Sequence, residues 1–231
     1  MHDTRWPTDR AHDLDDSPSN ERIATSDGRE LFGGVAESYA KARPDYPSAL
    51  LQILVDHRAL VAGVHTLEIG AGRGLATRQL IARGANPLTV VEPDRCFAKH
   101  LMALNQMCDF RLYTQAFEDT KFAPASFELA VLATSLPCID PKTRVRRLAA
   151  VVKAGGFVAI LNNVFQDPNK ADEFHDATQS ILQPLDVSPS GAPDTVPFAH
   201  ERAAREAEFS DAEFSDAGWF TMVAHWAGHS P

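Results

Sequence analysis

LEIGAGRG, residues 67–74, is the stretch that decides the fold of this 231-residue chain. An apolar run ends at Ile69, glycines occupy three of the next five positions, and an amphipathic stretch begins at Leu75. Glycine accepts positive φ and lets another group approach the backbone closely. A ligand at this loop would lie against a strand tip and a helix N-terminus, where open α/β sheets bind their ligands.

On both sides of this loop, apolar runs alternate with amphipathic segments. The pattern predicts strands over 64–69, 87–91, 110–113, 127–133 and 156–161, with helices over 75–82, 95–105 and 142–152. Runs such as LTVV and LAVLA are almost continuously apolar, as expected for parallel strands that are covered on both faces. We therefore expect an α/β fold with a Rossmann-like, doubly wound, mostly parallel sheet and helices on both faces.

The regions outside this alternation predict the domain limits. Residues 1–30 hold eight acids and four Lys/Arg and favour a mobile acidic N-terminal arm, with an ordered lid as the alternative. Residues 31–231 are expected to form one domain, in which 184–216 make a loop or lid and a linker. Helices are predicted over 47–60, closed by Gly63, and over 172–182 and 200–208, with one last strand over 219–225.

The spacing of the glycine loop separates three kinds of nucleotide site. The phosphate-loop pattern fails because no Lys-Ser or Lys-Thr pair follows the glycines. The dinucleotide pattern fails at its third position, which is Leu75, because the glycine falls at Gly74. Glu68 would disfavour a pyrophosphate and suits a ligand that carries an ammonium group and no phosphate. Glu92 ends the next predicted strand and could accept hydrogen bonds from both ribose hydroxyls, which supports an adenosine ligand without identifying it.

From Phe32 to Asp167 the chain resembles the class I S-adenosylmethionine-dependent methyltransferases, and in particular their small-molecule branch called methyltransferase type 11. LEIGAGRG resembles the family's first motif, VVEPD (90–94) its ribose-binding segment, QAFED (115–119) its adenine segment and FELAVLATS (127–135) its fourth-strand motif. AESYAKARPDYP, upstream, resembles the helix and turn that close over the cofactor. The resemblance implies S-adenosyl-L-methionine as cofactor, bound by Tyr39, Glu68, Gly70, Ala71, Gly72, Gly74, Glu92, Pro93, Phe117, Glu118 and Thr134.

Two departures from the family concern the acceptor side and the end of the sheet. Many relatives carry an aromatic residue or His followed by Trp after the fourth strand, whereas this chain has TSLPCIDP with Pro137 and Cys138 there. No acceptor-site role is carried over, and the catalytic residues stay unknown. The family usually ends in two antiparallel strands and only 219–225 fits one, so we expect a sheet shortened at its C-terminal end. The exposed edge would then favour either a homodimer through residues 217–227 or poor solubility.

Composition limits the partners. The chain has 31 acids, 22 Lys/Arg and a formal net charge of −9, which argues against binding nucleic acid or an anionic membrane and favours a small-molecule acceptor. The nine histidines and three scattered cysteines show no metal-ligand spacing, and the N-terminus has no signal-peptide pattern. A cytoplasmic protein without a metal is expected. Lys142, Arg144, Arg146 and Arg147 are interpreted as a solvated helix face, with a docking patch for an anionic partner as the alternative.

Three functions are compatible with these patterns. The first is methyl transfer from S-adenosylmethionine to the oxygen, nitrogen or carbon of a small molecule. The second is a non-catalytic relative that keeps the cofactor site, which the TSLPCIDP departure and the short C-terminus favour. The third is a nicotinamide-dependent oxidoreductase, against which Glu68 and Leu75 argue.

Overall fold

The computed structural model describes residues 45–106, 108–164, 198–215 and 217–222, together with Glu173 and Ala177. Tyr39, the predicted N-terminal arm, almost all of the predicted helix over 172–182 and the loop at 184–197 lie outside these residues. Among the helices of the described part, none is long and apolar enough to span a membrane.

A five-stranded parallel sheet forms the centre of the molecule. Its strands are β1 (Thr66–Ile69), β2 (Leu88–Val91), β3 (Arg111–Tyr113), β4 (Phe127–Ala133) and β5 (Val152–Leu161). They lie in the order β3-β2-β1-β4-β5, and every neighbouring pair is parallel. The chain moves outward from β1 to β3 and then returns to β4 on the other side of β1. This reversal is the switch point at which doubly wound sheets bind ligands, and it confirms the predicted fold class.

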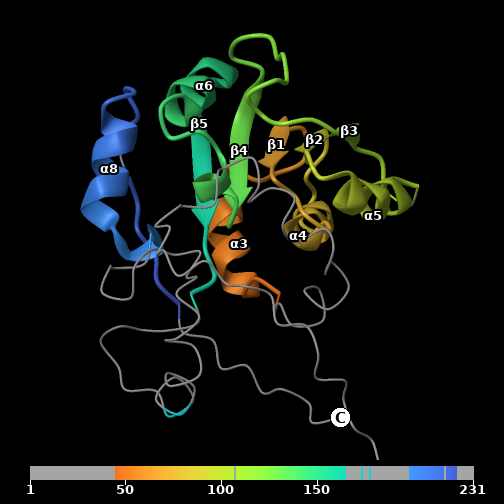
Figure 1. Cartoon of the computed structure of the whole chain (residues 1–231), viewed down its shortest axis with the longest axis horizontal. Coiled ribbons are helices and arrows are strands. Elements are labelled where there is room, and N and C mark those ends of the chain that lie inside the picture. The colour runs from red at the N-terminus through yellow and green to blue at the C-terminus, as the bar shows by residue number, and fades with distance from the viewer. Residues whose placement is uncertain are drawn as a thin grey trace, which may run out of the picture.

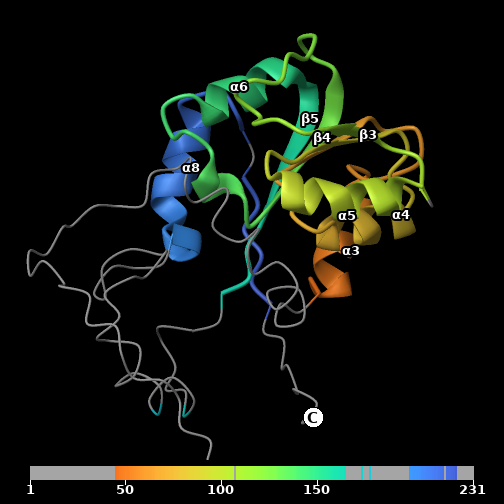
Figure 2. The same ribbon diagram turned by 45° about the vertical axis from the view of Figure 1, so that its right-hand side comes forward.

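Helices cover both faces of the sheet (Figure 1). Figure 2 shows α3 (Ser48–Asp56), α4 (Leu75–Ala82) and α5 (Arg95–Asn105) on one side and α6 (Arg144–Val151) on the other. Leu51, Leu80 and Leu101 of the first three helices share one buried cluster with Val90 and Leu129. A second cluster joins Leu148 and Val151 of α6 to the opposite face of the sheet. Because the residues of β1, β2 and β4 alternate between these clusters, the central strands are buried on both sides, whereas the edge strands β3 and β5 are partly exposed.

Most predicted elements are confirmed, and α4, α5 and β4 have the predicted bounds. The helix predicted over 47–60 is wrong at its end, since α3 stops at Asp56. Arg58 takes a positive φ of 58°, and the amides of Ala59 and Leu60 turn back to the carbonyl of Leu54. Gly63 therefore lies in the following loop and does not cap the helix.

The second half of the sheet also differs in its limits. β5 begins at Val152, four residues before the prediction, because a register shift opposite Phe127 lets the glycine pair join the strand. α6 is correspondingly shorter than predicted. The helix predicted over 200–208 is observed as a 3₁₀ turn, η4 (Phe198–His200), followed by α8 (Arg202–Ser210).

The strand predicted over 219–225 is wrong for the residues that are described. Residues 217–222 are exposed and belong to no strand, and His225 lies outside the described part. Their aromatic rings lie near other groups instead. The ring centroids of Phe220 and His57 are 6.3 Å apart, and the Arg202 guanidinium carbon lies 5.8 Å from the centroid of the Trp219 ring. Residues 217–222 therefore provide no edge strand for the predicted dimer through 217–227, and the dimer stays a prediction.

Candidate functional site

The glycine loop connects β1 to α4 and depends on positive φ at each glycine. Gly70, Gly72 and Gly74 have φ of 71°, 57° and 83°. A Cβ on Gly70 would lie 2.5 Å from the Cβ of Ser135, so glycine is what lets the loop approach the end of β4. The corresponding position on Gly72 has no described atom within 4 Å. Gly72 is therefore the part of the loop that a ligand can approach closely.

Glu92 holds this loop from the end of β2. Its Oε2 accepts a hydrogen bond of 2.7 Å from the Gly72 amide, and its Oε1 accepts one of 2.8 Å from the Asp94 amide. The side chain is buried, and this burial raises the pKa of Glu92 to about 6 against the opposing effect of the two amides. Each carboxylate oxygen has a second lone pair, so Glu92 could bind ribose hydroxyls while it fixes the loop.

The position of Glu68 differs from the one expected from the sequence, which predicted that Glu68 contacts the ligand directly. It is fully buried on β1, between Val90 and Val131 in the sheet register. The pKa of Glu68 is raised to about 7, mainly by burial; a hydrogen bond from Thr77 opposes this rise, and the nearby Glu92 charge adds to it. Neither oxygen has a hydrogen-bond partner of normal geometry among the described residues. Glu68 therefore lies beneath the glycine loop, with no exposed surface for a cofactor ammonium to contact.

A pocket opens at the carboxyl ends of β1 and β2. Four of the residues predicted to bind the cofactor line it, namely Gly70, Pro93, Phe117 and Glu118, and their role in binding stays a prediction. The other lining residues are Ile69, Val91, Ala116, Ser135, Cys138 and Ile139. Sequence reasoning did not assign Ser135, whose hydroxyl donates to the Ile69 carbonyl and so joins β4 to the glycine loop.

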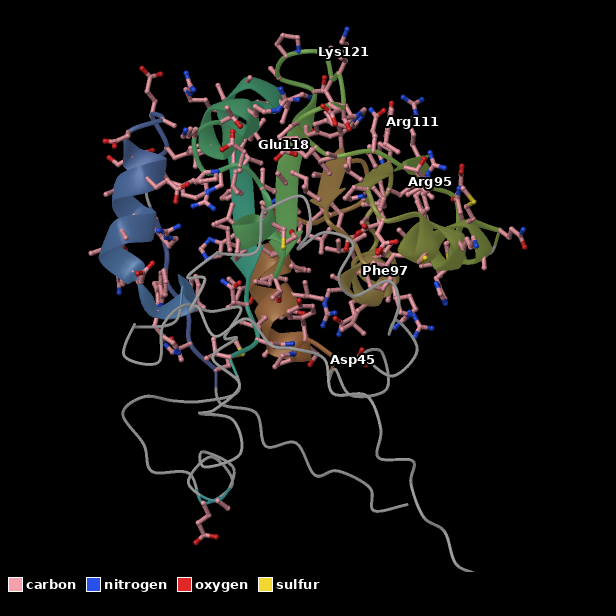
Figure 3. The ribbon with its side chains drawn as sticks, viewed as in Figure 1. Asp45, Arg95, Phe97, Arg111, Glu118 and Lys121 are labelled. Atoms are coloured by element: carbon pink, nitrogen blue, oxygen red, sulfur yellow. The ribbon has the colours of Figure 1, made fainter. Side chains whose placement is uncertain are left out.

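The two walls of the pocket are connected to each other. Glu118 Oε1 accepts a hydrogen bond of 2.9 Å from the Asp140 amide, which joins the 116–118 wall to the 135–139 wall. Figure 3 shows Glu118 together with the exposed side chains of Arg95, Arg111 and Lys121, which lie toward the outside of the domain. These cations do not line the pocket, whose described walls are mainly apolar.

Thr134 lies at the end of β4 in a left-handed conformation, with φ of 61°. Its hydroxyl shares a 2.8 Å hydrogen bond with Tyr46, and its amide donates to the Leu161 carbonyl. A β-branched residue rarely takes this conformation, so these contacts hold a strained turn. Tyr46 is itself buried, and its carbonyl accepts from Gln79 of α4. Tyr46 thus packs the upstream turn onto the domain, while Thr134 does not line the pocket.

The four basic residues between Lys142 and Arg147, of which the last three lie on α6, divide into two pairs, which corrects the solvated-face interpretation. Lys142 and Arg146 are exposed, whereas Arg144 is buried and Arg147 is half-buried. Arg147 donates to the carbonyls of Phe117 and Thr120, and its guanidinium lies 5.3 Å above the Phe117 ring. This arginine therefore supports the wall that the sequence assigned to adenine. The sequence did contain a signal for the burial of Arg144, because this residue is followed at helical spacing by the buried Leu148 and Val151.

The remaining predicted residues have clear positions. Ala71 is buried within the loop, and Gly74 is the N-cap residue of α4, where a Cβ would meet Leu101 and Leu104 of α5. Tyr39 lies outside the described residues. Within the part of the chain that is described, no cluster of three possible metal ligands occurs, and none of the three cysteines is in a disulfide.

Residues 67–160 match the family described as the methyltransferase domain. Similar solved structures include phosphoethanolamine N-methyltransferase 2 of Haemonchus contortus, in complex with phosphomonomethylethanolamine and S-adenosylhomocysteine. It is 16% identical with a TM-score of 0.59, over 85% of this chain and 45% of that chain. The [4+2]-cyclase SpnF is 13% identical with a TM-score of 0.52, over 63% of each chain. YcgJ of Bacillus subtilis is 18% identical with a TM-score of 0.53, over 73% of this chain and 69% of that one.

This chain thus spans less than two thirds of the Haemonchus enzyme and of the cyclase. At these identities the similarity shows the fold. No curated protein matches the sequence.

Proposed function

We propose that this chain is a class I S-adenosylmethionine-dependent methyltransferase and that it transfers a methyl group from S-adenosylmethionine to a small molecule. The observation that carries the proposal is the contact between Glu92 and the Gly72 amide at the switch point of the sheet. It places a carboxylate at the end of β2 directly beside an open glycine loop. An adenosine ligand with no phosphate fits this combination, because ribose hydroxyls need acceptors and the loop offers close backbone approach.

The residues present fit this cofactor. Of the residues that line the pocket, Phe117 would lie against the adenine and Gly70 would leave room for the methionine part. Glu92 would accept from the ribose, and the open space at Gly72 would let the cofactor approach the loop. When bound, S-adenosylmethionine supplies a methyl group on a sulfonium, which a nucleophile can take by in-line displacement. The contribution of the protein is then to hold both reactants in line and to exclude water.

A small-molecule acceptor is supported by the charge of the chain and of the site. The net charge of −9 disfavours nucleic acid, and the described walls of the pocket are mainly apolar. The Haemonchus enzyme was solved with a small phosphorylated amine, which is consistent with this class of acceptor. A cytoplasmic location stays a prediction.

A cofactor-binding relative without methyl transfer is the second candidate, because the described walls hold few proton acceptors. Glu118 is the one carboxylate among the lining residues, and its Oε1 already accepts from Asp140. SpnF, a [4+2]-cyclase, has a similar fold. Methyl transfer to an acceptor that is already deprotonated needs no base, so the first proposal stands without one.

Calorimetry with S-adenosylhomocysteine and NADH tests the cofactor. We expect S-adenosylhomocysteine to bind and NADH not to bind. Gly70→Val should abolish binding, because its Cβ would collide with Ser135 at the pocket wall. Gly155→Val is the matched control, since Gly155 has a similar φ of 75° but lies in β5 away from the pocket. Binding that survives Gly70→Val, or that is lost equally in both variants, contradicts the assigned site.

Incubation with methyl-labelled cofactor tests the acceptor class. Metabolite extract and nucleic acid are supplied in separate reactions. Label in the small-molecule fraction supports the proposal, and label in nucleic acid alone contradicts it. Binding of S-adenosylhomocysteine with no label in either fraction would favour the non-catalytic candidate.

A further inference from the structure

The C-terminal helix α8 is attached to α6 by a buried ion pair. Arg144 Nε and Nη2 donate to the two carboxylate oxygens of Glu208 at 2.5 and 2.8 Å, and the side chains are 5% and 19% exposed. Arg205, one turn earlier, donates to the same carboxylate. No side chain of α8 is fully buried, and Phe209 is its half-buried contact with the core. The position of α8 therefore depends strongly on this two-point contact, which fixes distance and orientation together.

The same guanidinium continues to the pocket. Arg144 Nη1 donates a 3.1 Å hydrogen bond to the carbonyl of Leu136, the first residue of the 3₁₀ turn η2 (Leu136–Cys138). Leu136 is fully buried, and Cys138 of this turn lines the pocket. A guanidinium is planar and rigid. When the Glu208 carboxylate fixes Nε and Nη2 of Arg144, it therefore also sets the direction in which Nη1 points.

α6 thus supports the two pocket walls through two arginines, and only one of them is also bonded to α8. Arg147 holds the Phe117 wall by hydrogen bonds to two backbone carbonyls, and among the described residues it makes no hydrogen bond or ion pair with α8. Arg144 holds the Leu136–Cys138 wall and is oriented from α8. Both views show α8 beside α6 at the β5 edge of the sheet (Figure 2).

We propose that Glu208 is a positioning residue of the pocket: through Arg144 it fixes the Leu136–Cys138 turn, so that α8 shapes the wall beside the glycine loop. This inference rests on the proposed function only for the identity of the ligand. The mechanical connection can be measured without any ligand, because Cys138 belongs to the turn and reports on its position. Cys96 on α5 is exposed and serves as an internal reference.

The experiment compares Glu208→Gln with Glu206→Gln in the full chain. Glu206 lies on the same helix but pairs with exposed Arg202 at the surface. The rate of alkylation by iodoacetamide is followed separately at Cys138 and Cys96 by mass spectrometry, and circular dichroism verifies the fold. Glu208→Gln should change the rate at Cys138 by about fivefold or more, because loss of a charge-assisted bond is typically worth 10-fold or more in an equilibrium. The Cys96 rate, and both rates in Glu206→Gln, should stay within about twofold of the parent.

Glu208→Asp should restore part of the parent rate, because it keeps the charge that holds Arg144. Folded Glu208→Gln with an unchanged Cys138 rate overturns the proposal. If Glu208→Gln does not fold, Arg144→Lys replaces it, since lysine keeps the charge but cannot reach Glu208 and Leu136 at once. S-adenosylhomocysteine titrations of the same proteins separate the two hypotheses. A parent chain that does not bind it, with a Cys138 rate that responds to Glu208→Gln, contradicts the proposed function and supports the positioning role.

Discussion

Glu68→Gln should change how the stability of this protein depends on pH. Burial raises the pKa of Glu68 from 4.5 to about 7, so the folded state holds a proton that the unfolded chain has already lost. Stability should therefore fall as pH rises between these values, and the full effect is about 3 kcal/mol. Between pH 5 and pH 8 the expected loss is about 2.5 kcal/mol.

Glutamine has nearly the same shape and cannot ionise, so the variant should lack this loss. A buried amide without partners costs about 1–3 kcal/mol, but that cost is the same at every pH. The informative quantity is the difference in unfolding free energy between variant and parent, measured with urea at pH 5, 6, 7 and 8. The unfolding free energy of Glu68→Gln should increase relative to that of the parent as pH rises. A difference that stays constant over this range would refute the reasoning, because Glu68 would then have an ordinary pKa in the folded protein.

Two further predictions concern the ligand site. Glu92→Ala should weaken S-adenosylhomocysteine binding by about 10- to 150-fold in calorimetry, and it should also lower the unfolding temperature because the Gly72 amide loses its acceptor; parent-like affinity would contradict the ribose assignment. Tyr46→Phe should lower the unfolding free energy in urea by about 1 kcal/mol through loss of its bond to Thr134, with affinity unchanged; a large loss of affinity with full stability would show that Tyr46 contacts the ligand.

The sequence was sufficient for the fold because its signals are local and agree with one another. The glycine loop, the apolar strands and the intervening helices each specify their own conformation, and α4, α5 and β4 were predicted to the residue. The predicted strand at 219–225 is wrong for the residues that are described. Its rings contact a histidine and an arginine side chain, and residues 217–222 join no ladder.

The site was harder to predict, because burial depends on neighbours that the sequence does not reveal. Glu68 and Glu92 are both acids at strand ends, yet one lies under the loop and the other holds it. Four basic residues at 142–147 look solvated in the sequence until the positions of Arg144 and Arg147 are known relative to the pocket walls. Ser135 could not be assigned at all, since its role comes from contact with a loop 65 residues earlier.

The pairing of β1 with β4 has a consequence for the newly synthesised chain. Thr66 lies beside Leu129, and the pocket takes one wall from each side of this central seam. A nascent chain that ends before β4 already contains the whole glycine loop and Glu92, but it lacks Ser135 and the turn that encloses the pocket. Contacts between such distant segments form late and slowly. The ligand should consequently stabilise only chains in which β4 has paired with β1. Protection from proteolysis by S-adenosylhomocysteine should therefore begin only once residue 139 has left the ribosome.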